Sequence, residues 1–80
     1  MDANTIGAVW QKAREIPGFS SLIWRWDDFG RVIRYTDYGN RQSQWGWEID
    51  HITPKSEGGT DLLSNLRPLN WVSNLERSGQ

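Results

Sequence analysis

The sequence contains no cysteine, and this absence excludes two common ways of stabilising a small domain. Neither a disulfide nor a thiolate metal site such as a zinc ribbon can form. The apolar runs are only a few residues long, and no basic segment followed by a hydrophobic one stands at the N-terminus. A membrane span and a signal peptide are therefore not predicted, and we expect a cytoplasmic protein.

The sequence also has little histidine and almost no net charge. One histidine is present among 80 residues, and the formal net charge is −1 at pH 7. A charge so close to zero argues against a protein that holds nucleic acid by bulk electrostatics alone. A chain of this length is enough for one domain, so we expect residues 1–80 to fold together.

Aromatic side chains have to supply much of the buried area. The hydrophobic fraction is only 36%, but six tryptophans, two tyrosines and two phenylalanines are present. Because aromatic residues bury a large area each, a compact aromatic core is expected. Most of the tryptophans are predicted to pack in this core, and stacking on unpaired bases is the less favoured alternative.

A short helix is predicted near the N-terminus. Asn4 or Thr5 can cap its first turn, and Pro17 with Gly18 is expected to end it. The apolar residues that recur at helical spacing are Ile6, Val9, Trp10 and Ala13.

The segment LIWRWDDFGRVIRY, residues 22–35, alternates like two strands around a turn at 27–30. This pattern predicts a hairpin. Trp24 and Trp26 flank Arg25, so they share one face of the strand, which we expect to be directed inward. A polar loop with one helical turn should follow before the next strand begins.

The last part of the chain predicts a second hairpin with a long connection, followed by a helix. Residues 47–52 alternate weakly like a strand, residues 53–65 form a loop, and LRPL at 66–69 is extended. Asn70 is a good N-cap for the closing helix. The expected order is helix, hairpin, strand, loop, strand, helix, which is an α+β fold.

Polar residues that can carry chemistry gather in this last part. Asp50 and His51 end the first strand, and Asn65 comes fourteen residues after the histidine. Asn74 lies in the closing helix, where asparagine is disfavoured because its amide competes for backbone hydrogen bonds. We therefore expect another role for Asn74. If the helix crosses the hairpin, the oxygens of Asp50 and Asn74 converge on one point beside His51.

Such a group fits phosphodiester hydrolysis. Two oxygen ligands suit a hard cation such as Mg²⁺, which keeps several waters and binds substrate phosphate. The imidazole of His51 can take a proton from water close to neutral pH. Hydrolysis needs a base for the nucleophile and a metal ion for the charge that develops on phosphate and leaving oxygen.

Each residue also has a simpler interpretation on its own. A single histidine at a strand end is commonly an ordinary, partly buried side chain. Asn65 can bond the backbone of its own loop, and Gly58 and Gly59 are interpreted as turn formers rather than as a phosphate cradle. The joint placement of Asp50, His51 and the two asparagines is what favours a site.

The segment EIDHITPKSEGGTDLLSNLRPLNWVSN resembles the HNH endonucleases and their ββα-metal motif. The resemblance covers about the last 35 residues, with the core of the motif at about 45–78. It implies a small ββα-metal domain, here with an N-terminal helix and an additional β-hairpin. It also implies that DNA is nicked or cleaved to leave a 5′-phosphate and a 3′-hydroxyl.

The resemblance implies a role for each matching residue. His51 is the general base, Asp50 and Asn74 are metal ligands, and Asn65 belongs to the catalytic set because it pins the loop. The basic residues expected to contact phosphate are Lys55, Arg67 and Arg77.

Three departures from the family pattern bear on the metal and on the fold. The last motif residue is asparagine rather than histidine, which favours Mg²⁺ or Mn²⁺ over Zn²⁺ or Ni²⁺. Ser78 stands where members with tighter metal sites carry a further histidine, so weak metal affinity is expected. The cysteine pairs of many relatives are absent, so the N-terminal helix and the tryptophans must brace the domain.

Two functions follow as hypotheses. The first is an endonuclease that hydrolyses DNA with one divalent cation, and the alternative is a non-catalytic module that binds nucleic acid or protein. A purely metal-stabilised structural unit is a third and less favoured hypothesis, because the site is poor in oxygen ligands. Whether the substrate is single-stranded, double-stranded, branched or RNA stays open, as does a homodimer or a larger protein partner.

Overall fold

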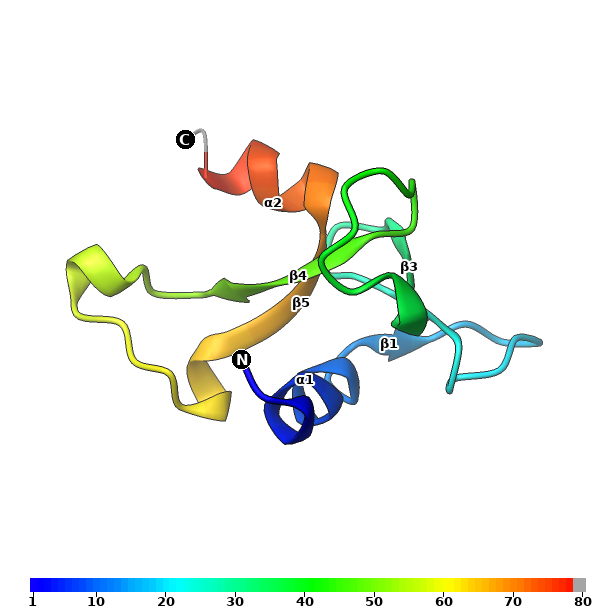
Figure 1. Cartoon of the computed structure of the whole chain (residues 1–80), viewed down its shortest axis with the longest axis horizontal. Coiled ribbons are helices and arrows are strands. Elements are labelled where there is room, and N and C mark those ends of the chain that lie inside the picture. The colour runs from blue at the N-terminus through cyan, green and yellow to red at the C-terminus, as the bar shows by residue number, and fades with distance from the viewer. Residues whose placement is uncertain (79–80) are drawn as a thin grey trace.

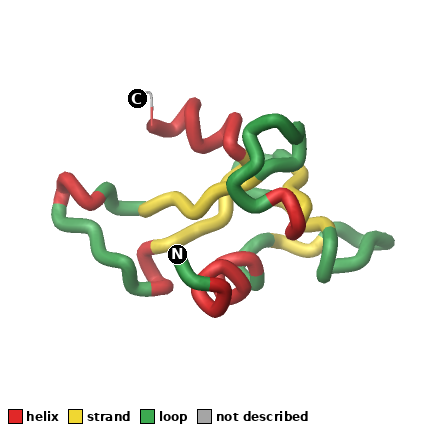
Figure 2. Tube along the Cα trace, in the orientation of Figure 1, coloured by secondary structure: helices red, strands yellow, loops and turns green. Residues whose placement is uncertain are grey.

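The structure is a computed structural model that describes residues 1–78. It contains two helices and two small antiparallel sheets, so the fold is α+β, as predicted (Figure 1). The elements are α1 (Ala3–Trp10), β1 (Arg14–Glu15), β2 (Trp24–Trp26), β3 (Val32–Arg34), β4 (Trp47–His51), β5 (Leu66–Asn70) and α2 (Trp71–Ser78). Three short 3-10 helices, red like the other helices in Figure 2, are η1 (Tyr35–Asp37), η2 (Lys55–Glu57) and η3 (Leu63–Asn65).

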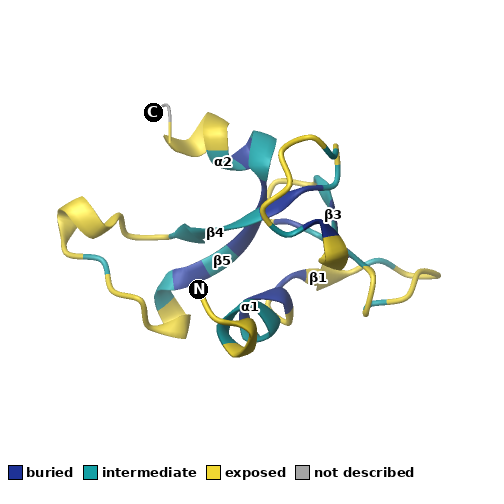
Figure 3. Cartoon of the chain, viewed as in Figure 1, coloured by how far each residue is buried: buried dark blue, intermediate teal, exposed yellow. Residues whose placement is uncertain are grey.

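The β4–β5 hairpin lies between the two helices, with α1 on one side and α2 on the other (Figure 1). Strands β4 and β5 pair along their full length, from Trp47 opposite Asn70 to His51 opposite Leu66. The connection between them is long and mostly exposed (Figure 3). The predicted strand, long loop, strand and helix are therefore confirmed. No helix among the described residues is long and apolar enough to cross a membrane.

Helix α1 starts earlier and ends earlier than predicted. Asp2 is the N-cap, because its carboxylate accepts a hydrogen bond from the amide of Thr5 at 2.8 Å. The prediction of Asn4 or Thr5 as the cap was wrong, since both lie inside the helix. The helix ends at Trp10 rather than at Pro17, because residues 14–15 pair with β2 as a third strand.

In β2, the central strand of the three-stranded sheet, the face directed inward is the opposite of the one predicted. Trp24 and Trp26 share a face, but Arg25 is the buried residue, with 6% exposure. Its guanidinium donates to the carbonyl oxygens of Gln11 and Ala13, just beyond the end of α1. The C-terminal end of a helix carries unpaired carbonyls and partial negative charge, so a cation is stabilised there.

The core is aromatic at its centre, but it contains fewer tryptophans than expected. Trp10 from α1 and Trp47 from β4 are almost fully buried, and their rings lie 5.3 Å apart. The other members of the buried cluster are Val9, Ala13, Ile33 and Leu66. The remaining four tryptophans are only partly buried, so the prediction that most tryptophans form the core was wrong. Helix α1 braces the hairpin through Trp10, as the lack of cysteine required.

A buried junction ties the first sheet to the start of α2. The carboxylate of Asp27 accepts hydrogen bonds from the amides of Phe29, Arg31 and Asn70, at 2.8 to 3.0 Å. The side chain of Asn70 caps α2 by accepting from the amide of Val72 at 2.9 Å, which confirms its predicted role. Asp27 and Asn70 are each 2% exposed. The turn after β2 and the first turn of α2 are therefore held in one position.

Candidate functional site

An open groove of about 450 Å³ lies where the end of β4 meets α2. The structure brings most of the residues predicted for the site to this groove. Those that line it are Asp50 and His51 of β4, Lys55 of the loop, Arg67 of β5, and Asn74 and Arg77 of α2. Asn65 does not line the groove.

Asp50 faces Arg67 across the β4–β5 ladder. Its Oδ2 accepts a hydrogen bond from Nε of Arg67 at 2.7 Å, and its side chain is 17% exposed. Arg67 also reaches Asp28 of the β2–β3 turn, with Nη1 to Oδ2 at 3.5 Å. The second oxygen of Asp50, Oδ1, makes no hydrogen bond to any residue from 1 to 78. One carboxylate oxygen is thus anchored and the other is available.

Asn74 is oriented by a carboxylate that the sequence analysis did not single out. Nδ2 of Asn74 donates to Oε1 of Glu48 at 2.8 Å. A carboxylate can only accept here, so the amide nitrogen must face Glu48 and the amide oxygen must face away. Alternation along β4 places Glu48 on the same face as Asp50, which is the signal that could have found it.

Glu48 is in turn held by Arg41, whose Nε and Nη2 donate to the two carboxylate oxygens at 2.7 and 2.8 Å. These hydrogen bonds, and a smaller contribution from Asn74, hold the pKa of Glu48 below its usual value, although partial burial opposes them. Glu48 therefore stays ionised at neutral pH. Its charge fixes the orientation of Asn74 in the groove.

His51 is likewise oriented by a carboxylate, that of Asp61 in the loop. Nε2 of His51 lies 2.7 Å from Oδ1 of Asp61, and Nζ of Lys55 lies 3.2 Å from Oδ2. Hydrogen bonds from His51 and Lys55 lower the pKa of Asp61, so this carboxylate is ionised and accepts. In the neutral imidazole the proton then sits on Nε2, which leaves Nδ1 unprotonated.

Asn65 closes the loop that carries Asp61. Its Oδ1 accepts from the amide of Thr53 at 2.8 Å, and its Nδ2 donates to the carbonyls of Thr53 and Thr60 at 3.0 and 2.8 Å. These three hydrogen bonds tie Thr53, at the start of the loop, to Thr60. Gly59 allows the same closure, because a Cβ there would lie 1.8 Å from the carbonyl oxygen of Thr53. Asp61 was missed because only this loop path brings it to His51.

The three basic residues differ in how far they are engaged. Arg67 and Lys55 pair with Asp50 and Asp61, as described above. Arg77 makes no ion pair with any described residue, and its guanidinium lies 4.8 Å from the ring centre of Phe29. The guanidinium of Arg67 lies 5.2 Å from the centre of the same ring. Arg77 is therefore the one arginine or lysine lining the groove whose charge no described carboxylate pairs.

The donor set of the groove suits a weakly held hard cation. Within residues 1–78, no cluster of three or more His, Cys, Asp or Glu side chains is suited to hold a metal ion. Asp50 and Asn74 nevertheless each present one oxygen that no described residue occupies. Mg²⁺ is commonly held by one or two protein oxygens, with water and substrate phosphate completing its shell. The residues present therefore fit such an ion, although Arg67, which already pairs with Asp50, would compete with it.

Comparison with known proteins agrees with this arrangement. The family model of the HNH endonuclease matches residues 39–78, which is half of the chain and runs from the loop before β4 to the end of α2. Neither a curated protein nor a solved structure matches the chain. The matched segment holds β4, the long loop, β5 and α2, with Asp50, His51 and Asn74 at one groove. The chain belongs to the HNH endonuclease family.

Proposed function

We propose that the protein is a metal-dependent endonuclease that hydrolyses DNA phosphodiester bonds, with His51 as the general base and one divalent cation. One observation carries the proposal: Asp50, His51 and Asn74 line a single groove, and a charged partner orients each side chain. Such orientation of the reacting groups is what a hydrolytic site requires.

In the proposed reaction, Nδ1 of His51 takes a proton from a water molecule that attacks the phosphorus. Asp61 stabilises the imidazolium that forms, because its carboxylate lies 2.7 Å from Nε2. Arg77 contacts the scissile phosphate. The bond from phosphorus to the 3′ oxygen breaks, and this oxygen takes a proton from solvent. The products are a 5′-phosphate and a 3′-hydroxyl.

Asp50 and Asn74 are proposed to hold the cation, Mg²⁺ or Mn²⁺, through their available oxygens. When bound, the cation would stabilise the negative charge that develops on the phosphate and on the leaving oxygen. Weak binding in the absence of DNA is expected because Arg67 already neutralises Asp50 at 2.7 Å.

A non-catalytic binding module is the alternative function. The ion pair between Arg67 and Asp50 favours it, because an engaged carboxylate is a poorer ligand. The oriented imidazole of His51 argues against it, since a module that only binds has no need of a fixed tautomer.

Cleavage of supercoiled plasmid in Mg²⁺, Mn²⁺ or EDTA tests the proposal. We expect metal-dependent nicking by the parent protein and a loss of about 100-fold or more for His51→Ala. Ser56→Ala is the matched control, because Ser56 is exposed in the same loop and makes no side-chain hydrogen bond to a described residue. Equal rates for parent and His51→Ala would refute the general base. No nicking by a folded parent would favour the binding module.

A further inference from the structure

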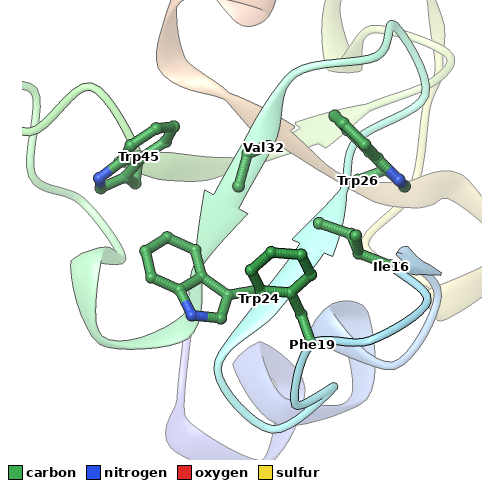
Figure 4. Close-up of a pocket in the computed structure, with 6 residues that line it drawn as sticks. All are labelled: Ile16, Phe19, Trp24, Trp26, Val32 and Trp45. Carbon is green, nitrogen blue, oxygen red and sulfur yellow. The ribbon is translucent and has the colours of Figure 1, made fainter.

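The outer face of the three-stranded sheet holds a second cavity, of about 310 Å³, away from the core. Figure 4 shows the side chains gathered around it. Its lining is apolar and largely aromatic: Ile16, Phe19, Trp24, Trp26, Val32 and Trp45. None of these residues belongs to the buried cluster, and Phe19 is 62% exposed. Binding pockets in proteins are commonly concave, of about 300 Å³ or more, and lined mostly by apolar and aromatic side chains.

The tryptophans here differ from the other three in their hydrogen bonds. The indole nitrogens of Trp10, Trp47 and Trp71 donate to backbone carbonyls. Those of the three cavity tryptophans make no hydrogen bond to any residue from 1 to 78. The rings of Trp24 and Trp45 meet edge to face, with centres 5.6 Å apart and planes at 90°. Three indole rings thus surround the cavity, and no residue of the described part of the chain bonds their N–H groups.

Cations stand beside these rings on the same face of the sheet. The strand register places Arg14 opposite Trp26 and Arg34 opposite Trp24. The guanidinium of Arg34 lies 5.5 Å from the ring centre of Trp24 and pairs with Asp37 at 2.8 Å. Arg14 is exposed and makes no ion pair within residues 1–78.

A short turn of the chain links the aromatic face to the groove. Trp26 is three residues from Phe29, a chain distance of at most about 10 Å. The ring of Phe29 lies beneath Arg67 and Arg77, both of which line the groove. The β2–β3 turn therefore runs from the cavity to the wall of the groove.

We propose that this face, formed by the three cavity tryptophans with Arg14 and Arg34, stacks the unpaired bases of a DNA strand that also enters the groove. The inference rests on the proposed nuclease function, and it predicts that the DNA substrate carries an unpaired segment. Single-stranded nucleic acid is typically held by aromatic rings that stack bases and by cations that follow the backbone. An apolar anchor of a protein partner would use the rings but would leave Arg14, which no described carboxylate pairs, without a role.

Binding in EDTA separates this inference from cleavage. Fluorescence anisotropy would compare a labelled oligothymidylate of about eight nucleotides with a short blunt duplex. We expect the parent to prefer the single strand, and Trp24→Leu and Trp26→Leu each to weaken its binding by about 5-fold to 100-fold. Trp26→Phe should retain most of the affinity, because it keeps an aromatic ring. Leu22→Ala is the matched control, since Leu22 is 74% exposed and does not line this cavity.

Unchanged melting temperatures would show that the variants fold. Equal affinity of the parent and both tryptophan-to-leucine variants for the single strand would overturn the inference. So would a parent dimer that Trp24→Leu converts to a monomer, because the face would then bind a second copy. A parent that nicks plasmid without preferring the single strand would overturn this inference alone. A parent that shows the expected binding pattern but never nicks would overturn only the nuclease function.

Discussion

Replacement of Asn70 by alanine removes three hydrogen bonds at the joint between β5 and α2. Its Nδ2 donates to the carbonyl oxygens of Val32 and Gln44 at 3.0 and 2.8 Å. Its Oδ1 accepts from the amide of Val72 at 2.9 Å as the helix cap. The residue is 2% exposed, so water does not easily replace these partners. The position of α2, and with it that of Asn74, depends on this side chain.

The loss of stability follows from these contacts. An N-cap replaced by alanine costs about 1 kcal/mol. Each carbonyl left without its donor costs about 1 kcal/mol or more, which gives a total of about 3 kcal/mol. A chain of this length is stabilised by roughly 4 to 12 kcal/mol, so the change removes a large part of that free energy. The melting temperature should fall by about 12 to 24 °C.

Urea unfolding and thermal unfolding of the parent, Asn70→Ala and Asn70→Ser measure this cost. Serine keeps a cap oxygen but lacks the amide donors, so it should recover about 1 kcal/mol and no more. A loss below about 1 kcal/mol for alanine would refute the reasoning. Full recovery by serine would show that the cap alone matters and that the bonds to Val32 and Gln44 contribute nothing.

The remaining predictions concern the two carboxylates that orient the site. Asp61→Asn should lower kcat by about 10-fold to 100-fold while DNA affinity is kept. Because Lys55 donates to the second oxygen of Asp61, an asparagine there should turn its amide oxygen to Lys55 and its amide nitrogen to Nε2 of His51. The ¹⁵N shifts of His51 should then lose the Nε2–H tautomer, and an unchanged tautomer would contradict the assignment. Hydrogen bonds from Arg41 lower the pKa of Glu48. The stability that the ionised carboxylate gives the protein is therefore present at pH values above 4.5, the ordinary pKa of glutamate, and is lost as the pH falls through the lower pKa of Glu48 in the folded protein. Glu48→Gln should therefore destabilise the protein by about 1 kcal/mol near neutral pH and by much less near pH 3, as measured by urea unfolding; an equal loss at both pH values would contradict this origin.

The second half of the fold was predictable because its signals are local. Residues 53–65 carry the glycines of a loop, and Gly58 adopts a positive φ of 90°, which favours glycine. Asn70 was predicted to cap α2, and it does. The set of Asp50, His51 and Asn74 was predicted from one short segment, and the structure places all three at one groove.

The first half was less predictable because its outcome depends on distant groups. In the three-residue strand β2, alternation shows that Trp24 and Trp26 share a face but does not say which face is buried. The buried face is determined by the carbonyl oxygens of Gln11 and Ala13, which accept hydrogen bonds from the guanidinium of Arg25. Hydrophobicity alone favours the tryptophans inside. Asp61 was missed for a similar reason, since only the folded loop brings it within 2.7 Å of His51.

Most charges around the groove are paired with one another, which bears on the proposed binding of DNA. The carboxylates of Glu48, Asp50 and Asp61 are matched by Arg41, Arg67 and Lys55. Arg67 also reaches Asp28, and Arg77 is the one arginine or lysine lining the groove that makes no ion pair with a described residue. One cation gives little affinity for a polyanion, and the net charge of −1 adds none. In the two proposals above, affinity for DNA comes from a divalent ion at Asp50 and Asn74 and from stacking on the three cavity tryptophans, so the two proposals support one another.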